Sequence, residues 1–216
     1  MFCGACPAIG LVWPIRTSPV VNSRLVAQPK RYPEDDAEAL WRLFEAVPSH
    51  FKAEIIDGTL HVNPRPSSDH QVANGALTAF IGVPYMYQGD GGGPDGWWIV
   101  SEPGVRVQVK GEFAPDHAGW RRSKLPFLPS IITSAPDWVC EILSPGNAGY
   151  DRDTKMPFYA RLGIEWVWLI DVERRDIEVH QLRGAAYTRL PMTLGSEARL
   201  PPFEHIALPV HRFWLS

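Results

Sequence analysis

Residues 135–172, APDWVCEILSPGNAGYDRDTKMPFYARLGIEWVWLIDV, decide the fold of this chain. The run at 138–143 is short, β-prone and apolar on both faces, which is typical of a strand inside a sheet. Ser-Pro-Gly at 144–146 ends it, and a helix follows that stops near Gly163. A second buried strand is expected at 165–171. Strand, short helix and strand together predict a right-handed crossover and parallel pairing of the two strands.

Glu141 is the residue of this stretch that most needs an explanation. Side-chain alternation places Asp137, Val139, Glu141 and Leu143 on one face of the strand. A carboxylate inside a buried strand is unfavourable unless it is paired, protonated or bound to a metal. Asp137 lies roughly 13 Å away at the rise of a strand, so we expect local hydrogen bonds to hold it at the strand end. A partner for Glu141 must then come from a neighbouring strand.

Asp116 is the carboxylate that fits this requirement. The sequence FAPDHA at 113–118 predicts a neighbouring strand that carries it. Two carboxylates on adjacent strands can meet across a gap of roughly 5 Å. Oxygen ligands of this kind suit magnesium or manganese. Lys155, near the start of the helix that follows Glu141, could complete such a site.

The remaining elements are expected to surround this central unit. Residues 51–62 predict a β-hairpin that turns at Asp57-Gly58, a dipeptide typical of tight hairpin turns. Residues 67–69 are expected to cap a helix that carries His70 near its start. After the second buried strand, residues 176–182 predict a strand that pairs antiparallel with it.

Composition bounds the class of protein. The chain has 216 residues, of which 45% are hydrophobic and 21% charged, with a formal net charge of −3. These values are ordinary for a globular domain, and no apolar run is long enough to cross a bilayer. Nothing at the level of the whole chain marks a nucleic-acid-binding protein, so a basic surface would have to be local. We expect a loosely structured tail at 1–33 and one domain at 34–216.

Several strings, in their order along the chain, resemble a known family. Pro115-Asp116, Glu141 and Lys155 resemble the PD-(D/E)XK nuclease superfamily. The strings AEIIDGTL, GGPDGWWIVSEP, FAPDHAGWRRSKLP, APDWVCEILSP, DRDTKMPFYARLGIEWVWLIDV and PPFEHIAL are similar to the Uma-type family, whose members are described as restriction endonucleases. The similarity runs from about residue 32 to the C-terminus.

The resemblance implies a restriction-endonuclease-like α/β core, with a mixed central sheet flanked by helices, and Mg²⁺- or Mn²⁺-dependent hydrolysis of phosphodiester bonds. Carried over by position, Asp116 and Glu141 would be metal ligands together with the backbone carbonyl of Ile142. Lys155 would be the catalytic lysine. The superfamily pattern places a lysine two residues after the glutamate, and Leu143 stands there in this chain.

The resemblance also implies further properties of the protein. Glu54 and His70 match positions that would lie at the cleft. The substrate would be a nucleic acid, with DNA favoured over RNA, and the protein would be cytoplasmic, without a membrane partner; a homodimer is compatible with it. Two other interpretations stay open: a catalytically silent module of the same fold that binds nucleic acid or protein, and a hydrolase of another phosphoester. From its burial alone, Glu141 could also have a purely structural role.

Overall fold

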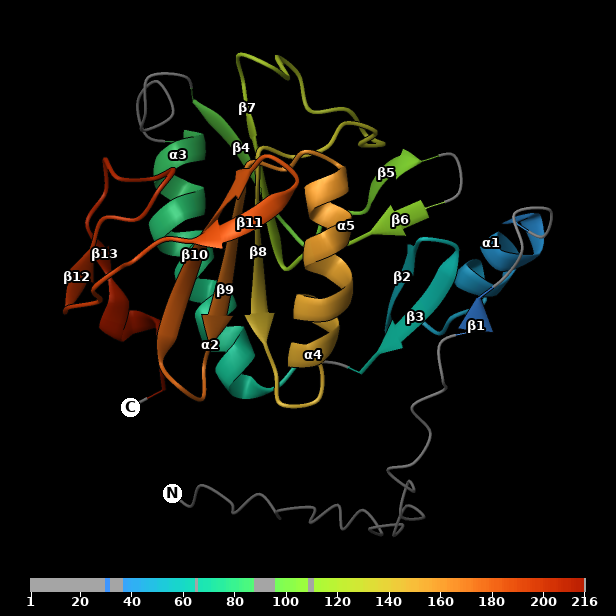
Figure 1. Cartoon of the computed structure of the whole chain (residues 1–216), viewed down its shortest axis with the longest axis horizontal. Helices are drawn as coiled ribbons and strands as arrows, with labels where there is room; N and C mark the ends of the chain where they lie inside the picture. The colour runs from blue at the N-terminus through green and yellow to red at the C-terminus, as the bar shows by residue number, and fades with distance from the viewer. Residues whose placement is uncertain (1–29, 32–36, 65, 88–95, 109–110, 216) are drawn as a thin grey trace, which may run out of the picture.

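The computed structural model describes residues 30–31, 37–64, 66–87, 96–108 and 111–215. Its centre is a six-stranded mixed sheet with the strand order β11-β10-β9-β8-β7-β4 (Figure 1). β8 (Trp138–Leu143) and β9 (Trp166–Asp171) lie in the middle and pair in parallel, which confirms the predicted unit. The other members are β4 (Trp97–Ser101), β7 (His117–Arg121), β10 (Asp176–Arg183) and β11 (Ala186–Arg189). Each of their pairings is antiparallel, including the predicted one between β9 and β10.

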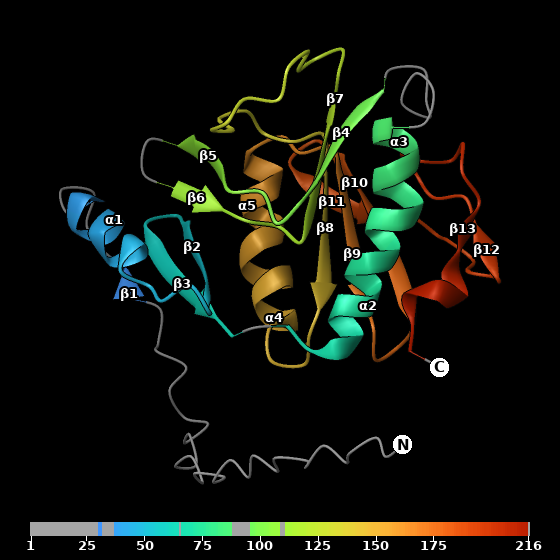
Figure 2. The same cartoon turned by 180° about the vertical axis from the view of Figure 1, so that it is seen from behind.

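Helices cover both faces of this sheet (Figures 1 and 2). One face carries a helical run of three segments, α2 (Ser68–Leu77), the π-helical η2 (Thr78–Gly82) and α3 (Val83–Tyr87). The other face carries the crossover between β8 and β9, formed by α4 (Ala148–Tyr150), the π-helical η3 (Asp151–Lys155) and α5 (Met156–Arg161). The crossover ends before Gly163, whose φ of +72° suits a residue without a side chain.

The alternation of β8 divides the core into two layers. Trp138, Cys140 and Ile142 pack in the cluster that contains the buried residues of α2. Val139 and Leu143 pack on the other side with Phe158 and Tyr159 of α5, and Cys140 is fully buried. Glu141 therefore faces the crossover helix, as the alternation of the sequence predicts.

A smaller sheet stands beside the crossover helix. β2 (Lys52–Ile56) and β3 (Thr59–Asn63) form the predicted hairpin. Asp57 and Gly58 have φ values of 51° and 70°, which are the backbone angles of a tight primed turn. α1 (Ala37–Glu45) contacts β2, and β1 (Lys30–Arg31) pairs with β3, although its two residues fall inside the predicted tail. The rest of that tail, residues 1–29 and 32–33, lies outside the described residues.

The prediction of one strand at 113–118 is wrong. β6 (Gly111–Phe113) pairs with β5 (Val105–Gln108) in a sheet of its own, and β7 starts only at His117. Pro115 lies between the two strands, where its missing N–H removes no ladder hydrogen bond. Asp116 thus lies at the point where the chain passes from the small sheet to the central one.

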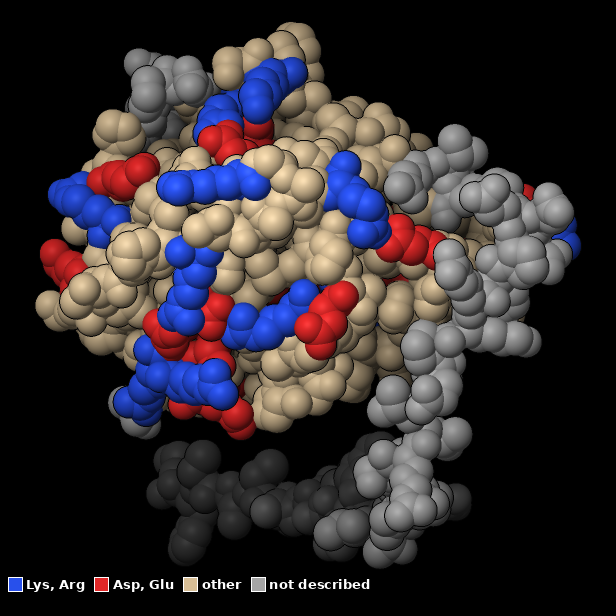
Figure 3. Space-filling view, in the orientation of Figure 1, with Lys and Arg blue, Asp and Glu red and all other residues tan. Residues whose placement is uncertain are grey.

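The C-terminal part closes the face that α2 and α3 cover. β12 (Glu197–Ala198) pairs with β13 (Leu208–Pro209), and η4 (Val210–Phe213) packs against α2. On the molecular face of Figure 3, Lys and Arg side chains alternate with Asp and Glu side chains. In the part of the chain that the structure describes, no helix is long and apolar enough to cross a membrane.

Candidate active site

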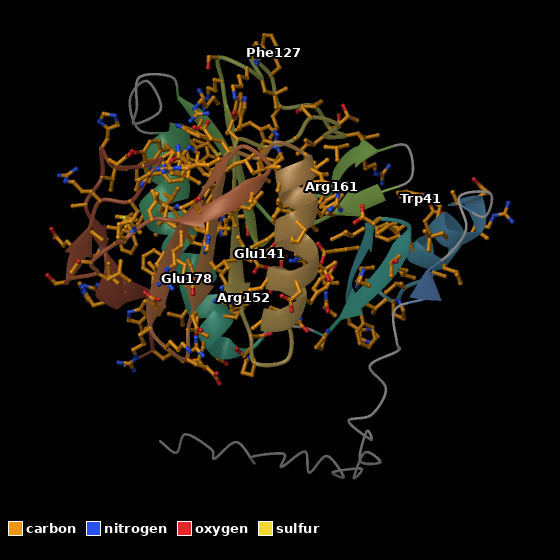
Figure 4. The ribbon with its side chains drawn as sticks, viewed as in Figure 1. Trp41, Phe127, Glu141, Arg152, Arg161 and Glu178 are labelled. Carbon is orange, nitrogen blue, oxygen red and sulfur yellow. The ribbon has the colours of Figure 1, made fainter. Side chains whose placement is uncertain are left out.

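A cavity of about 260 Å³, which we call the site cavity, opens at the carboxyl end of β8. Asp116, Glu141 and Lys155 all line it, although they come from three separate segments of the chain. His70 and Ile142 line it as well. Figure 4 shows Glu141 between β8 and the crossover helix. The structure therefore brings the predicted catalytic residues together, while the roles assigned to them remain predictions.

Asp116 lies opposite Glu141 because of the register between β7 and β8. These strands pair antiparallel, with His117 opposite Cys140. One further step along each strand places Asp116 opposite Glu141. Facing residues of an antiparallel pair have Cα atoms roughly 4.5–5.5 Å apart. Two carboxylates at this spacing on neighbouring segments of the chain are suited to share a cation.

Three donors surround the Asp116 carboxylate. Lys52 Nζ lies 2.8 Å from Oδ1, and His70 Nε2 lies 3.0 Å from Oδ2. The backbone N–H of Ile142 donates to Oδ2 at 2.8 Å. Burial would raise the pKa of Asp116, but Lys52 and His70 outweigh burial and hold that pKa well below its usual value. Asp116 is therefore a carboxylate at neutral pH.

Glu141 and Lys155 form a buried ion pair on the other side of the cavity. Lys155 Nζ lies 3.1 Å from Glu141 Oε1, and the Tyr159 hydroxyl donates to the same oxygen. Burial raises the pKa of Glu141, opposed by Lys155. Burial alone would lower the pKa of Lys155, but Glu141 and Glu54 raise it well above its usual value. Lys155 is thus a fixed positive charge at neutral pH, even though only 2% of it is exposed.

Glu54 and Asp151 are the other acidic partners of Lys155, at 3.1 and 3.6 Å from its Nζ. Glu54 is completely buried and lies behind the residues that line the site cavity. Its other oxygen accepts a hydrogen bond from the backbone N–H of Ala114 at 2.9 Å. Glu54 thereby connects the hairpin to the segment that carries Asp116. Asp151 lines the cavity itself, and burial raises its pKa.

Lys52 and Asp151 were missed as site residues from the sequence. Lys52 carried a usable signal, because it is two residues before Glu54 in a predicted strand, and such residues share a face. Two opposite charges on one face of a short hairpin strand indicate a polar partner nearby. The sequence around Asp151 indicates only an acidic residue near the start of a helix. Its distance from Lys155 follows from helical spacing, since the two are one turn apart.

The charges at the site suit a divalent cation. Four buried carboxyl groups, those of Glu54, Asp116, Glu141 and Asp151, face two ammonium groups, those of Lys52 and Lys155. Buried carboxylates in excess favour binding of a cation or a proton. Among the described residues, no three His, Cys, Asp or Glu side chains already form a group that could hold a metal ion. The fit therefore rests on Asp116 and Glu141 with oxygen atoms beside them, such as the Ile142 carbonyl.

Asp137 behaves as a structural residue. Its carboxylate accepts hydrogen bonds from the backbone N–H of Arg121 at 2.8 Å and from the Arg121 guanidinium at 3.1 Å. The Lys124 ammonium also contacts it. The prediction that hydrogen bonds hold Asp137 at the strand end is confirmed, but the donors come from β7 and the loop after it and are not local in the chain. Arg121 and Lys124 are therefore both paired with Asp137, although the Lys124 side chain is 64% exposed.

The fold and the site define a class of protein. A mixed central sheet flanked by helices on both faces is the architecture of restriction-endonuclease-like α/β proteins. The chain belongs to the Uma2 family, because the model of that family, described as "Putative restriction endonuclease", matches residues 41–211.

A solved structure supports the same fold. The crystal structure described as a "putative nuclease belonging to DUF820" from Anabaena variabilis ATCC 29413 superposes with a TM-score of 0.60. It is 17% identical in sequence, and the match covers 81% of this chain and 96% of that chain. No curated protein matches the chain.

Proposed function

We propose that the protein is a metal-dependent endonuclease that hydrolyses phosphodiester bonds of nucleic acid, with DNA as the preferred substrate. The observation that carries this proposal is the meeting of Asp116, Glu141 and Lys155 in one cavity. A buried lysine that touches three carboxyl groups has little use in a simple binding surface. Family membership supports the same reaction class.

Asp116 and Glu141, with the backbone carbonyl of Ile142, would hold Mg²⁺ or Mn²⁺. When bound, such an ion supplies an activated water and neutralises charge on the phosphate. Lys155 keeps its proton at neutral pH, so it acts as a cation and not as a base. Its ammonium would orient the attacking water and stabilise negative charge that develops on the phosphate oxygens.

The other side of the site cavity is suited to an anionic substrate. Pro66, Ser67 and His70, at the N-terminal end of α2, line it. The Ser67 side chain caps α2 by accepting from the backbone N–H of His70. The N-terminal turn of a helix favours a phosphate through its free N–H groups and its dipole. Lys52 adds a positive charge at the same side, so the scissile phosphate would lie between α2 and β8.

Cleavage assays with metal control test this proposal. Single-stranded DNA, duplex DNA and RNA are incubated with the protein and Mg²⁺, Mn²⁺ or EDTA. Cleavage should require metal, and Asp116→Asn or Glu141→Gln should lower it by about 100-fold or more, as expected when charge stabilisation at the reacting phosphate is lost. Titration with Mn²⁺ should show weaker metal binding by both variants.

Glu178→Gln provides a matched control for Glu141→Gln. Glu178 is also a buried glutamate on a strand of the central sheet, but it lies outside the site cavity. This variant should keep cleavage and Mn²⁺ binding. Cleavage of no substrate by the wild-type protein with either metal would contradict the proposal and favour the silent module.

A further inference from the structure

A second cavity, which we call the side cavity, opens next to the site cavity and has a volume of about 460 Å³. Lys52, Pro66 and Glu102 line both cavities. The Lys52 side chain lies between the two cavities. It lines both of them, and its ammonium group pairs with Asp116. A ligand that binds at Asp116 and is larger than the site cavity would therefore extend past Lys52 into the side cavity.

One wall of the side cavity is aromatic. His50 and Phe51 precede β2, and their ring centroids lie 4.3 Å apart. Phe51 is 42% exposed, although burying such a ring is worth roughly 1.5–3 kcal/mol. The two rings are tilted by 43° to each other, so each offers its own aromatic face to the cavity. Planar π-systems stack on such surfaces.

The side cavity also has polar lining residues. Ser49 and Gln71 line the side cavity, and neither side chain forms a hydrogen bond to another residue that the structure describes. Together they offer a hydroxyl and an amide, which donate and accept hydrogen bonds. A planar ligand with donors and acceptors on its edge could stack on the aromatic residues and form hydrogen bonds with the polar ones.

Glu102 connects the two cavities through its backbone. Glu102 has a φ of 47°, a conformation that is uncommon for a residue with a side chain. Its backbone N–H donates to the carbonyl of Asp116 at 3.0 Å. Strained residues of this kind persist where the surrounding structure defines a functional geometry. Glu102, which lines both cavities, is therefore connected directly to the backbone of Asp116.

We propose that the side cavity is a base subsite, which binds the nucleobase of the nucleotide next to the scissile phosphate. The base would stack on Phe51 and His50, and its polar edge would face Gln71 and Ser49. The inference rests on the proposed function and names its substrate more closely. A base in this cavity is separated from its neighbours in the strand, so the substrate is single-stranded or locally unpaired nucleic acid.

Binding measurements in EDTA test the subsite without cleavage. The probes are a strand of about 12 deoxythymidines and an abasic strand with the same number of phosphates, a length within the range that single-strand-binding domains cover. Phe51→Ala should weaken binding of the deoxythymidine strand about tenfold, since stacking on an aromatic side chain contributes at this level. It should weaken binding of the abasic strand less than about twofold, because phosphate contacts remain. Phe51→Trp should bind the deoxythymidine strand about as tightly as the wild type does.

Phe127→Ala is the matched control. Phe127 is 84% exposed and lies on the loop after β7, away from the hairpin of β2 and β3 (Figure 4). This variant should bind both strands as the wild type does. An oligouridine strand in the same assay distinguishes RNA from DNA as the source of the base, and a dependence on Phe51 with either supports the subsite.

Three results would overturn the base subsite: equal weakening of both strands by Phe51→Ala, unchanged binding of both, or no binding of any strand by the wild type. These are separate from failure of the proposed function, which is the absence of metal-dependent cleavage. A wild-type protein that cleaves DNA while Phe51→Ala binds every probe normally would refute the subsite and leave the endonuclease in place.

Discussion

At the scale of single residues, Lys155 occupies the position on which the proposed chemistry depends most. Its ammonium group lies within 3.6 Å of Glu54, Glu141 and Asp151. The PD-(D/E)XK pattern places a lysine on the strand, where this chain has Leu143. Leu143 shares its face of β8 with Glu141 and packs in the same core cluster as Phe158 and Tyr159 of the crossover helix. We therefore propose that Lys155 on that helix takes the place of the lysine that the pattern puts on the strand.

We predict that Lys155→Ala lowers metal-dependent cleavage by about 100-fold or more, which is the usual effect of removing a group that stabilises charge in the transition state. Adding Leu143→Lys should restore part of the activity, since the new ammonium enters the same volume. The restoration should be partial, because Leu143 is only 3% exposed and a charge there displaces apolar packing. The measurement is the cleavage rate of the wild type, the single variant and the double variant at saturating Mg²⁺.

Full activity of Lys155→Ala would contradict this role and leave the lysine as a structural cation. Circular dichroism on all three proteins establishes that they are folded. A folded double variant without any rescue would indicate that Leu143 is packed too tightly to place an ammonium group beside the phosphate.

At the scale of elements, the crossover helix contains a π-helical turn, η3, that carries both Asp151 and Lys155. In η3 the backbone N–H of Met156 bonds to the carbonyl of Asp151, five residues earlier. Pro157 follows and has no N–H for the carbonyl of Asp153, so a regular α-helix is disfavoured at this point. The helical run on the other face repeats this arrangement, with η2 followed by Pro84. Such π-turns are frequent at functional sites.

We predict that Pro157→Ala lowers cleavage about tenfold or more while the melting temperature stays the same or rises. The alanine allows a regular α-helix, which would turn Asp151 and Lys155 by about 100° relative to α5. Pro84→Ala makes the same change on the opposite face and should keep full cleavage. Rates and melting curves of both variants check this. Normal cleavage by Pro157→Ala would mean that the ion pairs of Lys155 hold the π-turn without help from the proline.

A second cluster joins the crossover helix to the sheet. Arg152 forms two hydrogen bonds to Glu178 of β10, at 2.9 and 2.8 Å, and the two side chains lie together in Figure 4. His180 also contacts Glu178, at 3.0 Å. Arg152 lowers the pKa of Glu178 to about 2, against the opposing effect of burial. The carboxylate is therefore more acidic in the folded than in the unfolded chain.

We predict that Glu178→Gln lowers the free energy of unfolding by about 2 kcal/mol at pH 7, an estimate reduced for the solvent near Arg152. A carboxylate whose pKa is lowered by folding stabilises the protein above its unfolded pKa. That stabilisation is lost as the pH falls from about 4.5 through about 2. The difference between variant and wild type in urea unfolding should therefore vanish near pH 2.

Asp176→Asn is the control for this experiment, because it removes the exposed partner of Arg189, which also contacts Glu178. Its effect on the free energy of unfolding should be within about 0.5 kcal/mol, as for most exposed ion pairs. An equal loss in Glu178→Gln at pH 7 and at pH 2 would show that packing, and not charge, connects the helix to β10.

At the scale of the whole molecule, the site lies where the small sheets meet the central one. Lys52 and Asp116 are 64 residues apart in the chain, and His70 and Asp116 are 46 residues apart. Glu54 joins β2 to the backbone at Ala114 and also contacts Lys155. The hairpin therefore contributes two residues, Lys52 and Glu54, that contact the candidate site residues. Its position depends on the packing of β2 against β6.

We predict that deletion of residues 1–29 changes the melting temperature by no more than about 2 °C, because the sequence of this segment has no periodic apolar face that would pack on the core. A deletion of residues 1–31 also removes β1 from β3 and should lower the melting temperature further. Thermal unfolding of the two truncated proteins and the full chain makes the comparison. A large loss with the shorter deletion would show that the tail contributes to the core.

The sequence by itself was sufficient for the local features. The bounds of β8, the turn at Asp57-Gly58, the Ser67 cap of α2 and the stop at Gly163 all agree with it. These depend on interactions between near neighbours: alternation, turn angles and capping. The face of Glu141 follows from the same period of two. The need for a partner of Glu141 pointed to Asp116 and Lys155, and the family resemblance assigned their roles.

Only the tertiary structure decided how these pieces surround the cavity. Pro115 separates two strands that the sequence joined, and Lys52 reaches Asp116 from a different sheet. Asp151 becomes a site residue because the helix carrying it packs over β8. Contacts of this kind depend on how separate elements pack, and local propensity contains no term for that. The chain therefore specifies its strands residue by residue, whereas the site exists only once both sheets and the crossover helix are in place.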